Sequence, residues 1–93
     1  MRYILQPGVV LASVCDEQLL VATGDARGKV PYVKGINKPG AYFWNLLEQN
    51  LREEEIICRA MADYGASEEI AREALRKFTG TLAENGYLTI EQE

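Results

Sequence analysis

The chain has 93 residues, of which 47% are hydrophobic and 26% are charged, and its formal net charge is −4. This length suits one domain around one hydrophobic core, and the composition excludes a disordered chain. Phosphate binding depends on Lys and Arg, so the acidic balance disfavours nucleic acid as a partner. No apolar run approaches the roughly 18 residues that a membrane span needs, and the N-terminus lacks a signal-peptide pattern. We therefore expect a single cytoplasmic domain over residues 1–93 with no membrane partner.

The first third of the chain predicts three β-strands. Val9–Cys15 and Gln18–Thr23 are rich in strand-forming residues, and Asp16-Glu17 between them has the length of a tight hairpin turn. A flexible polar loop then leads to a third strand over about Lys29–Ile36. This strand contains Pro31, which has no N–H to donate, so we expect it at the edge of the sheet.

The rest of the chain has helical periodicity. Asn37 is placed to cap a first helix that runs to about residue 49, with Pro39 in its first turn. A second helix is predicted over about residues 52–64, and a third from its Ser67 cap to about residue 84. Residues 87–90 could add a short extended tail. Strands followed by helices indicate an α+β fold, with a three-stranded antiparallel sheet followed by three helices on one of its faces.

The residue types that carry most enzyme chemistry are missing or dispersed. There is no histidine, and Cys15 and Cys58 are far apart with no metal-ligand spacing, so we expect two buried thiols and no metal or cofactor. No nucleophile–base set or glycine-rich phosphate loop is present, which predicts a non-catalytic protein. Trp44 lies on the apolar stripe of the first helix. There it packs in the core or, with Tyr32 and Tyr42, anchors an interface.

Basic residues gather around the third strand. The window 27–38 has no acidic residue and four basic ones, which are Arg27, Lys29, Lys34 and Lys38. Lysines on an edge strand can simply discourage aggregation. They can also form a docking strip for an extended acidic peptide, held by main-chain hydrogen bonds. In the second case, the small Ala71 and Ala74 on the third helix would leave room for apolar anchors beside Phe78.

The helical half of the sequence resembles the PqqD-like proteins, also called precursor-peptide recognition elements. The resemblance spans about residues 9–90 and is carried by Asn37, Pro39-Gly40-Ala41-Tyr42-Phe43-Trp44, Leu46-Leu47, Glu55-Ile56, Tyr64, Phe78, Leu82 and Asn85-Gly86-Tyr87-Leu88. It implies a winged helix-turn-helix fold. It also implies binding of the leader of a ribosomally made peptide (a RiPP precursor, as in PQQ biosynthesis). The leader would then be delivered to a modifying enzyme such as a radical SAM protein with an iron–sulfur cluster.

The resemblance also implies where the leader binds. In the family, the leader adds as a strand beside the third strand and packs against the third helix. The corresponding peptide-binding residues here are Val30, Tyr32, Val33, Lys34, Gly35 and Ile36 on the strand, and Ile70, Ala71, Ala74, Leu75, Lys77 and Phe78 on the helix. This chain lacks the glycine that follows the first helix in many relatives, and Asn50 is the candidate cap of the second helix.

Two other functions stay open from the sequence. A winged-helix DNA-binding regulator would use the third helix for recognition, but that helix carries three basic and four acidic residues, a net charge of −1. A homodimer is also compatible with an exposed sheet edge, which can pair with its own copy.

Overall fold

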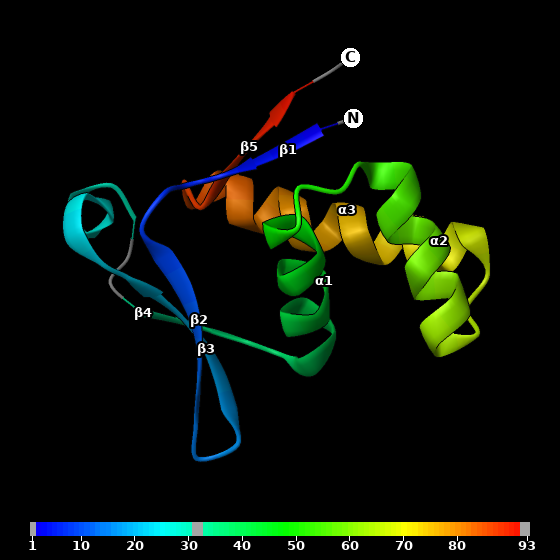
Figure 1. Ribbon diagram of the computed structural model, residues 1–93, viewed down its shortest axis with the longest axis horizontal. Helices are drawn as coiled ribbons and strands as arrows, with labels where there is room; N and C mark the ends of the chain where they lie inside the picture. The colour runs from blue at the N-terminus through cyan, green and yellow to red at the C-terminus, as the bar shows by residue number, and fades with distance from the viewer. Residues whose placement is uncertain (1, 31–32, 92–93) are drawn as a thin grey trace.

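The computed structural model describes residues 2–30 and 33–91, so the predictions for Pro31 and Tyr32 lie outside the described residues. Figure 1 shows the three helices on one side, with a strand pair above them and a second sheet beside them. The elements are β1 (Arg2–Leu5), β2 (Val9–Val14), β3 (Glu17–Ala22), the 3₁₀ helix η1 (Gly24–Gly28), β4 (Val33–Ile36), α1 (Lys38–Glu48), α2 (Glu53–Tyr64), α3 (Glu68–Glu84) and β5 (Leu88–Glu91). The predicted α+β class, with an antiparallel sheet followed by three helices, is confirmed.

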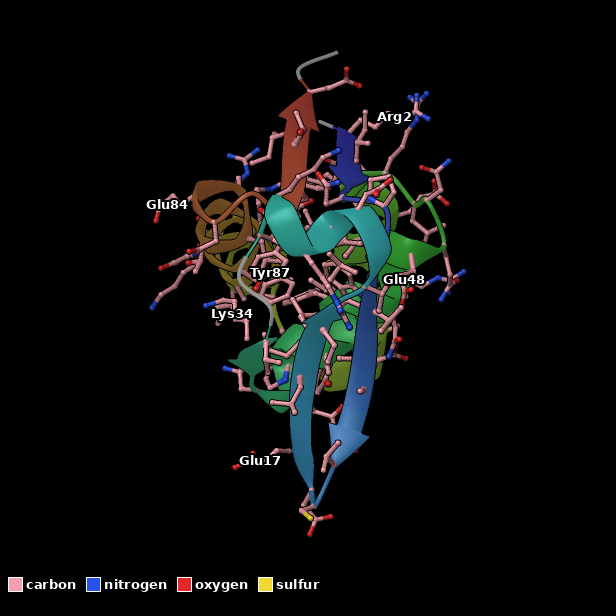
Figure 2. The ribbon with its side chains drawn as sticks, turned by 90° about the vertical axis from the view of Figure 1, so that its left-hand side faces the viewer. Arg2, Glu17, Lys34, Glu48, Glu84 and Tyr87 are labelled. Carbon is pink, nitrogen blue, oxygen red and sulfur yellow. The ribbon has the colours of Figure 1, made fainter. Side chains whose placement is uncertain are left out.

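Strands β2, β3 and β4 form the antiparallel sheet in that order, which places β4 at an edge as predicted. The register aligns Leu11, Leu20 and Lys34 across the three strands. Leu20 is fully buried, so this face of the sheet is turned toward the helices. Figure 2 shows the β2–β3 hairpin extending away from the helices, with Glu17 close to its tip.

The hairpin turn lies one residue earlier than predicted. Val14 pairs with Glu17, so the two-residue loop is Cys15-Asp16 and Glu17 belongs to β3. Both loop residues have positive φ, 50° at Cys15 and 67° at Asp16. This is the conformation of a type I′ turn, whose twist matches that of the flanking strands. The sequence did not reveal the position of this turn, because the pair Cys15-Asp16 lacks the glycine that type I′ turns usually contain.

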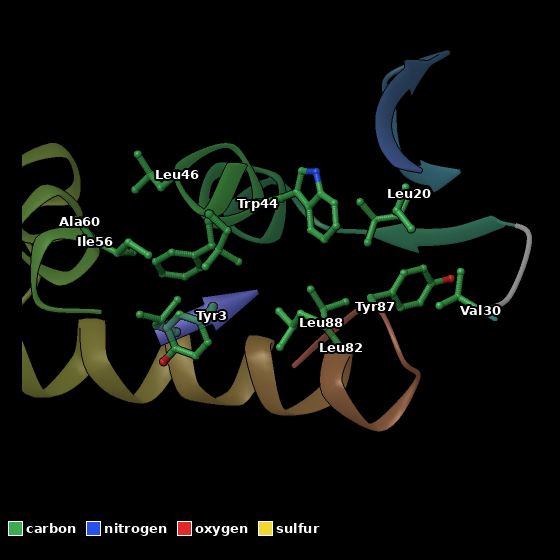
Figure 3. Packing of buried hydrophobic residues seen from close by; sticks show 14 of the residues in the cluster. Tyr3, Leu20, Val30, Trp44, Leu46, Ile56, Ala60, Leu82, Tyr87 and Leu88 are labelled. Carbon is green, nitrogen blue, oxygen red and sulfur yellow. The ribbon is translucent and has the colours of Figure 1, made fainter. Parts of the chain in front are cut away.

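The predicted loop and third strand also need correction. Residues 24–28 form η1, and the amides of Lys29 and Val30 donate to the carbonyl of Ala26. The described part of the strand therefore begins at Val33. Val30 is buried in the core, where Figure 3 shows it next to Tyr87.

The pair β1–β5 brings the two ends of the chain together. The extended tail was predicted, but its antiparallel partner β1 was not, and the register runs from Arg2 opposite Glu91 to Leu5 opposite Leu88. Tyr3 on β1 is buried and packs into the hydrophobic core. Four residues with a single inward-facing aromatic side chain give too weak an alternation to identify a strand from sequence.

Side-chain caps begin two of the helices, as predicted. The Asn37 Oδ1 atom accepts a hydrogen bond from the Gly40 amide at 2.7 Å, and the Ser67 Oγ atom accepts one from the Ile70 amide at 3.2 Å. The prediction that Asn50 caps α2 is wrong. Asn50 follows α1 in the left-handed conformation (φ 60°), which asparagine tolerates, and Arg52 is the N-cap residue of α2. Gly65 ends α2 in the left-handed conformation at φ 66°, which glycine adopts at little cost.

The core lies between the helices and the inner face of the sheet. Its largest fully buried side chains include Trp44 and Tyr87, and Figure 3 shows Trp44 pointing from α1 toward Leu20. The expectation that Trp44 packs in the core is confirmed. The expectation of buried thiols is wrong, because Cys15 lies in the hairpin turn and Cys58 on the outer side of α2, both exposed. Within residues 2–30 and 33–91, no helix has the length and apolar character needed to cross a membrane.

Candidate functional site

A groove of about 390 Å³ lies between the edge strand β4, the start of α1 and the second half of α3. It is lined by Lys34, Gly35, Ile36, Asn37, Pro39, Gly40, Phe43, Ala74, Lys77, Phe78, Thr81 and Leu82. Two consecutive elements, β4 and α1, and the distant helix α3 therefore supply its walls. Its position places an unpaired strand edge beside an apolar depression.

The wall from β4 follows the alternation of a strand. Lys34 and Ile36 are half-buried and share the face that is turned toward the helices, whereas Val33 and Gly35 are exposed. Because β3 occupies one side of β4, the main chain of β4 is open on its other side within the described sheet. A strand edge of this kind can accept a further strand through main-chain hydrogen bonds.

The wall from α3 is one face of the helix. Ala74, Lys77, Phe78 and Thr81 have the i, i+3, i+4, i+7 spacing that places side chains in a single stripe. Ala74 is small and exposed, so it leaves open space between α3 and β4. The other face of α3 points into the core, where Ala71 and Leu75 are buried.

Two phenylalanines and a glycine shape the floor of the groove. The rings of Phe43 and Phe78 have centroids 6.1 Å apart with 33° between their planes. Gly40 lies against Phe78 so closely that a Cβ atom added to it would be 2.9 Å from the Phe78 ring and 2.9 Å from Asn37 Oδ1. Real Cβ contacts are essentially never this short, so only glycine at position 40 allows Phe78 its present place.

The groove brings together half of the twelve residues predicted from the family resemblance. These six are Lys34, Gly35, Ile36, Ala74, Lys77 and Phe78. Val30, Ala71 and Leu75 are buried in the core instead (7%, 3% and 0% exposed). Val33 is on the outer face of the sheet, Ile70 is 63% exposed beyond the groove, and Tyr32 lies outside the described residues.

The sequence prediction missed six residues that line the groove. They are Asn37, Pro39, Gly40, Phe43, Thr81 and Leu82. One residue separates β4 from α1, so the first turn of α1 has to lie beside the strand that the prediction had already selected. Extending the helical spacing of Ala74 and Phe78 by one turn would also have found Thr81.

The basic side chains of α3 have different surroundings. Arg72 and Arg76 donate to the buried carboxylate of Glu53, with N–O distances of 2.7 and 2.9 Å, and Arg72 also binds Glu54 at 3.0 Å. Hydrogen bonding to Glu54 and Glu53 raises the pKa of Arg72. Lys77, by contrast, lies at the groove. Its ammonium has no ion-pair partner in the described part of the chain.

A tyrosine completes the arrangement around Glu53. The Tyr3 hydroxyl donates to Glu53 Oε2 at 3.0 Å. Burial, together with the neighbouring Glu53 carboxylate, raises the pKa of Tyr3 to about 12. This network joins β1, α2 and α3 and lies apart from the groove. Among the described residues, no group of three or more His, Cys, Asp or Glu could hold a metal ion.

Two solved structures with the same architecture contain a leader peptide. The chain superimposes with a TM-score of 0.77 on TbiB1, solved in complex with the TbiA(beta) leader peptide, over 97% of this chain and 99% of that one, at 27% identity. Lasso peptide synthetase B1, complexed with its leader peptide, matches over 97% and 100% with a TM-score of 0.73, and at 18% identity this shows the fold alone.

Comparison with curated proteins gives no match. The family comparison is more specific than the structural likeness, because it concerns the sequence itself. Residues 32–88, which include β4, the three helices and the whole groove lining, match the family described as coenzyme PQQ synthesis protein D (PqqD). The match covers more than half of the chain. The chain belongs to the PqqD family.

Proposed function

We propose that this protein captures the leader segment of a ribosomally synthesised precursor peptide, by strand addition to β4, and presents it to a modifying enzyme. The observation that carries the proposal is the groove between an open strand edge and the face of α3 that presents Ala74, Lys77, Phe78 and Thr81. Such a combination suits an extended peptide: the edge supplies main-chain partners, and the groove accepts side chains on one face of the peptide. TbiB1, which is 27% identical over nearly its whole length, was solved with a leader peptide bound.

In this proposal the domain contributes binding and no catalysis. The peptide's main chain pairs with β4, while an apolar side chain enters the groove against Phe43 and Phe78. The chemistry belongs to a partner enzyme of RiPP biosynthesis, for which a radical SAM protein is the leading candidate. Residues 1–93 act as one domain, in the cytoplasm where ribosomal precursors are made.

DNA binding through α3 has less support. A recognition helix needs cationic side chains that are available to phosphate oxygens. Arg72 and Arg76 are committed to Glu53, and Glu54 and Glu68 also lie within ion-pair distance of Arg72. Most of the positive charge of α3 is therefore already compensated by carboxylates.

An amide NMR titration tests the proposal. The probes are synthetic peptides that correspond to the N-terminal segments of short open reading frames beside this protein's own gene, with a DNA duplex as comparison. We expect one such peptide to shift the amide signals of residues 33–37 and 74–81. The duplex should leave α3 unchanged.

A matched pair of variants locates the binding site. Ala74→Trp fills the groove, whereas Ala62→Trp places the same bulk on the exposed side of α2. We expect the first to abolish peptide binding, and the second to retain it with an unchanged fold by circular dichroism. Equal binding by both folded variants, or a response to the duplex alone, would refute leader capture in this groove.

A homodimer through β4 is the competing use of the same edge. If two copies paired there, leader binding and self-association would exclude one another. Sedimentation velocity with and without the bound peptide distinguishes them. We expect the sedimentation coefficient of the free protein to be independent of concentration, and a dimer that the peptide dissociates would show that the edge serves both purposes.

A further inference from the structure

The groove is a positively charged site in an acidic protein. Two lysines line it, Lys34 from β4 and Lys77 from α3, and none of the acidic residues that the structure describes does, although the chain has a net charge of −4. Within residues 2–30 and 33–91, neither lysine forms an ion pair, in contrast to Arg72 and Arg76. Two uncompensated ammonium groups from separate elements thus border one apolar depression. Such a site is complementary to a ligand that combines apolar surface with negative charge.

The first turn of α1 adds to this potential. Acidic residues occupy the first turns of α2 and α3, but the first turn of α1 has none. The partial positive charge of that helix end is therefore not offset by an acidic side chain, and Asn37, Pro39 and Gly40 at this end all line the groove. The helix end reinforces the field of the two lysines.

Strand geometry fixes the spacing between apolar and acidic groups in such a ligand. Lys34 and Ile36 are two residues apart on the same face of β4. Of these two residues, Ile36 is nearer in sequence to the groove-lining residues at the start of α1. A peptide strand paired with β4 also directs every second side chain toward the groove, about 7 Å apart. An apolar side chain opposite Ile36 therefore places the next groove-facing side chain at the level of Lys34.

We propose that the captured segment carries an apolar anchor and, two residues away on the same face, an Asp or Glu that is held by Lys34 and Lys77. This inference rests on the proposed leader capture and adds its specificity rule. The anchor fills the space beside Phe43 and Phe78, and the carboxylate neutralises the two lysines. An acidic residue next to the anchor in sequence would instead face the outer side of the sheet, near Val33 and Gly35.

The test uses the peptide that shifts β4 in the titration above, and isothermal titration calorimetry measures its affinity. The peptide is made in three forms: unchanged, with the acidic residue two positions from the anchor converted to its amide, and with the acid moved to the position adjacent to the anchor. Each form is measured against the wild-type protein and against Lys34→Gln and Lys77→Gln. Lys29→Gln is the control variant, because Lys29 is exposed and does not line the groove.

We expect each groove variant to weaken binding of the unchanged peptide about two- to fivefold at low salt, as for partly exposed ion pairs. The amide and displaced-acid peptides should bind the wild-type protein with a similar loss, and the groove variants should weaken them no further. Lys29→Gln should bind like the wild type.

Three results would overturn the specificity rule while leaving leader capture intact. In the first, the bound segment has no acidic residue two positions from its anchor. In the second, the amide form binds as tightly as the unchanged form. In the third, Lys29→Gln weakens binding as much as Lys77→Gln. Failure of every peptide to bind at all is a different outcome. It would refute the proposed function itself, and the rule with it.

Discussion

Glu53 is a buried carboxylate that links β1, α2 and α3. It is 2% exposed and accepts hydrogen bonds from Tyr3, Arg72 and Arg76, which come from β1 and α3. A buried carboxylate is tolerated only when it is paired and hydrogen-bonded, and Glu53 has both kinds of partner. Its place at the start of α2 adds the favourable end of the helix dipole.

Replacing this carboxylate should be costly for stability. We expect Glu53→Gln to lower the free energy of unfolding by about 2–3 kcal/mol, because a neutral amide would face two arginines and lose the charge-assisted bonds. Urea denaturation followed by circular dichroism measures the change. Glu54→Gln is the matched control, since Glu54 binds Arg72 but is exposed, and it should have only a small effect. Similar losses for the two variants would mean that the buried network is not the stabilising element.

Tyr3 should make the protein sensitive to high pH. Its pKa is raised to about 12 by burial and by Glu53, above the ordinary value of 10.0. The protonated Tyr3 hydroxyl therefore makes its full contribution to the stability of the folded protein below about pH 10, and this contribution is lost as the pH rises toward 12. Thermal unfolding of the wild type and of Tyr3→Phe between pH 9 and 12 tests this. The variant should lose less stability across that interval, and parallel curves would exclude Tyr3 as the titrating group.

At the scale of secondary structure, two glycines in helices have opposite roles. Gly80 lies inside α3 with nothing within 4 Å of an added Cβ, whereas Gly40 in α1 lies in close contact with Phe78 and Asn37. Glycine generally weakens a helix interior relative to alanine. Replacing glycine by alanine should therefore stabilise the protein at position 80 and destabilise it at position 40.

Gly80→Ala should raise the free energy of unfolding by about 0.5–1 kcal/mol. Gly40→Ala should lower it by about 1–3 kcal/mol, because the new methyl group forces Phe78 or the Asn37 cap to move. Moving Phe78 also alters the groove floor, so Gly40→Ala should weaken peptide binding while Gly80→Ala should not. Chemical denaturation and calorimetry measure both effects. A stabilised Gly40→Ala with normal affinity would show that Phe78 adjusts freely.

The β2–β3 hairpin can be improved at its turn. Cys15 and Asp16 both have positive φ, which costs energy for residues with a side chain, and Asn-Gly is the preferred pair for a type I′ turn. We expect the double substitution Cys15→Asn, Asp16→Gly to raise the free energy of unfolding by about 1 kcal/mol, measured by thermal denaturation. Glu17→Gly should instead lower it, because Glu17 is a paired strand residue. If Glu17→Gly raised the free energy of unfolding and the double substitution lowered it, the turn would instead lie at Asp16-Glu17.

The helices were predictable because their signals are local. Asn37, Ser67 and Gly65 act through atoms within a few residues, and the apolar spacing of α3 records which side is buried. The hairpin turn and β1 were not predictable in this way. Cys15-Asp16 adopts its conformation because the strands on both sides are held in register, and β1 becomes a strand because β5 returns beside it.

For the molecule as a whole, the site prediction was limited by the direction of helical side chains. The sequence identified α3 and β4 as candidate walls, but a wide apolar stripe does not reveal which edge meets the sheet and which meets the core. Ala71 and Leu75 point into the core, while Ala74 and Phe78 line the groove. Only the packing of α3 against α2 and β5 decides this division. Phe43 and Gly40 of α1 also line the groove only because of how the elements pack together, which the sequence does not reveal.

The pairing of β1 with β5 has a further consequence for architecture. Arg2 lies opposite Glu91, so both ends of the chain leave the domain at one place, which Figure 1 shows at the top of the view. The groove is built from β4, α1 and α3, and contains no residue of β1 or β5. This domain can thus be joined at either end to a larger protein, or inserted into a loop of that protein, and the groove stays accessible in both cases. Fusion to an enzyme would replace a two-protein encounter with a high local concentration of the captured substrate.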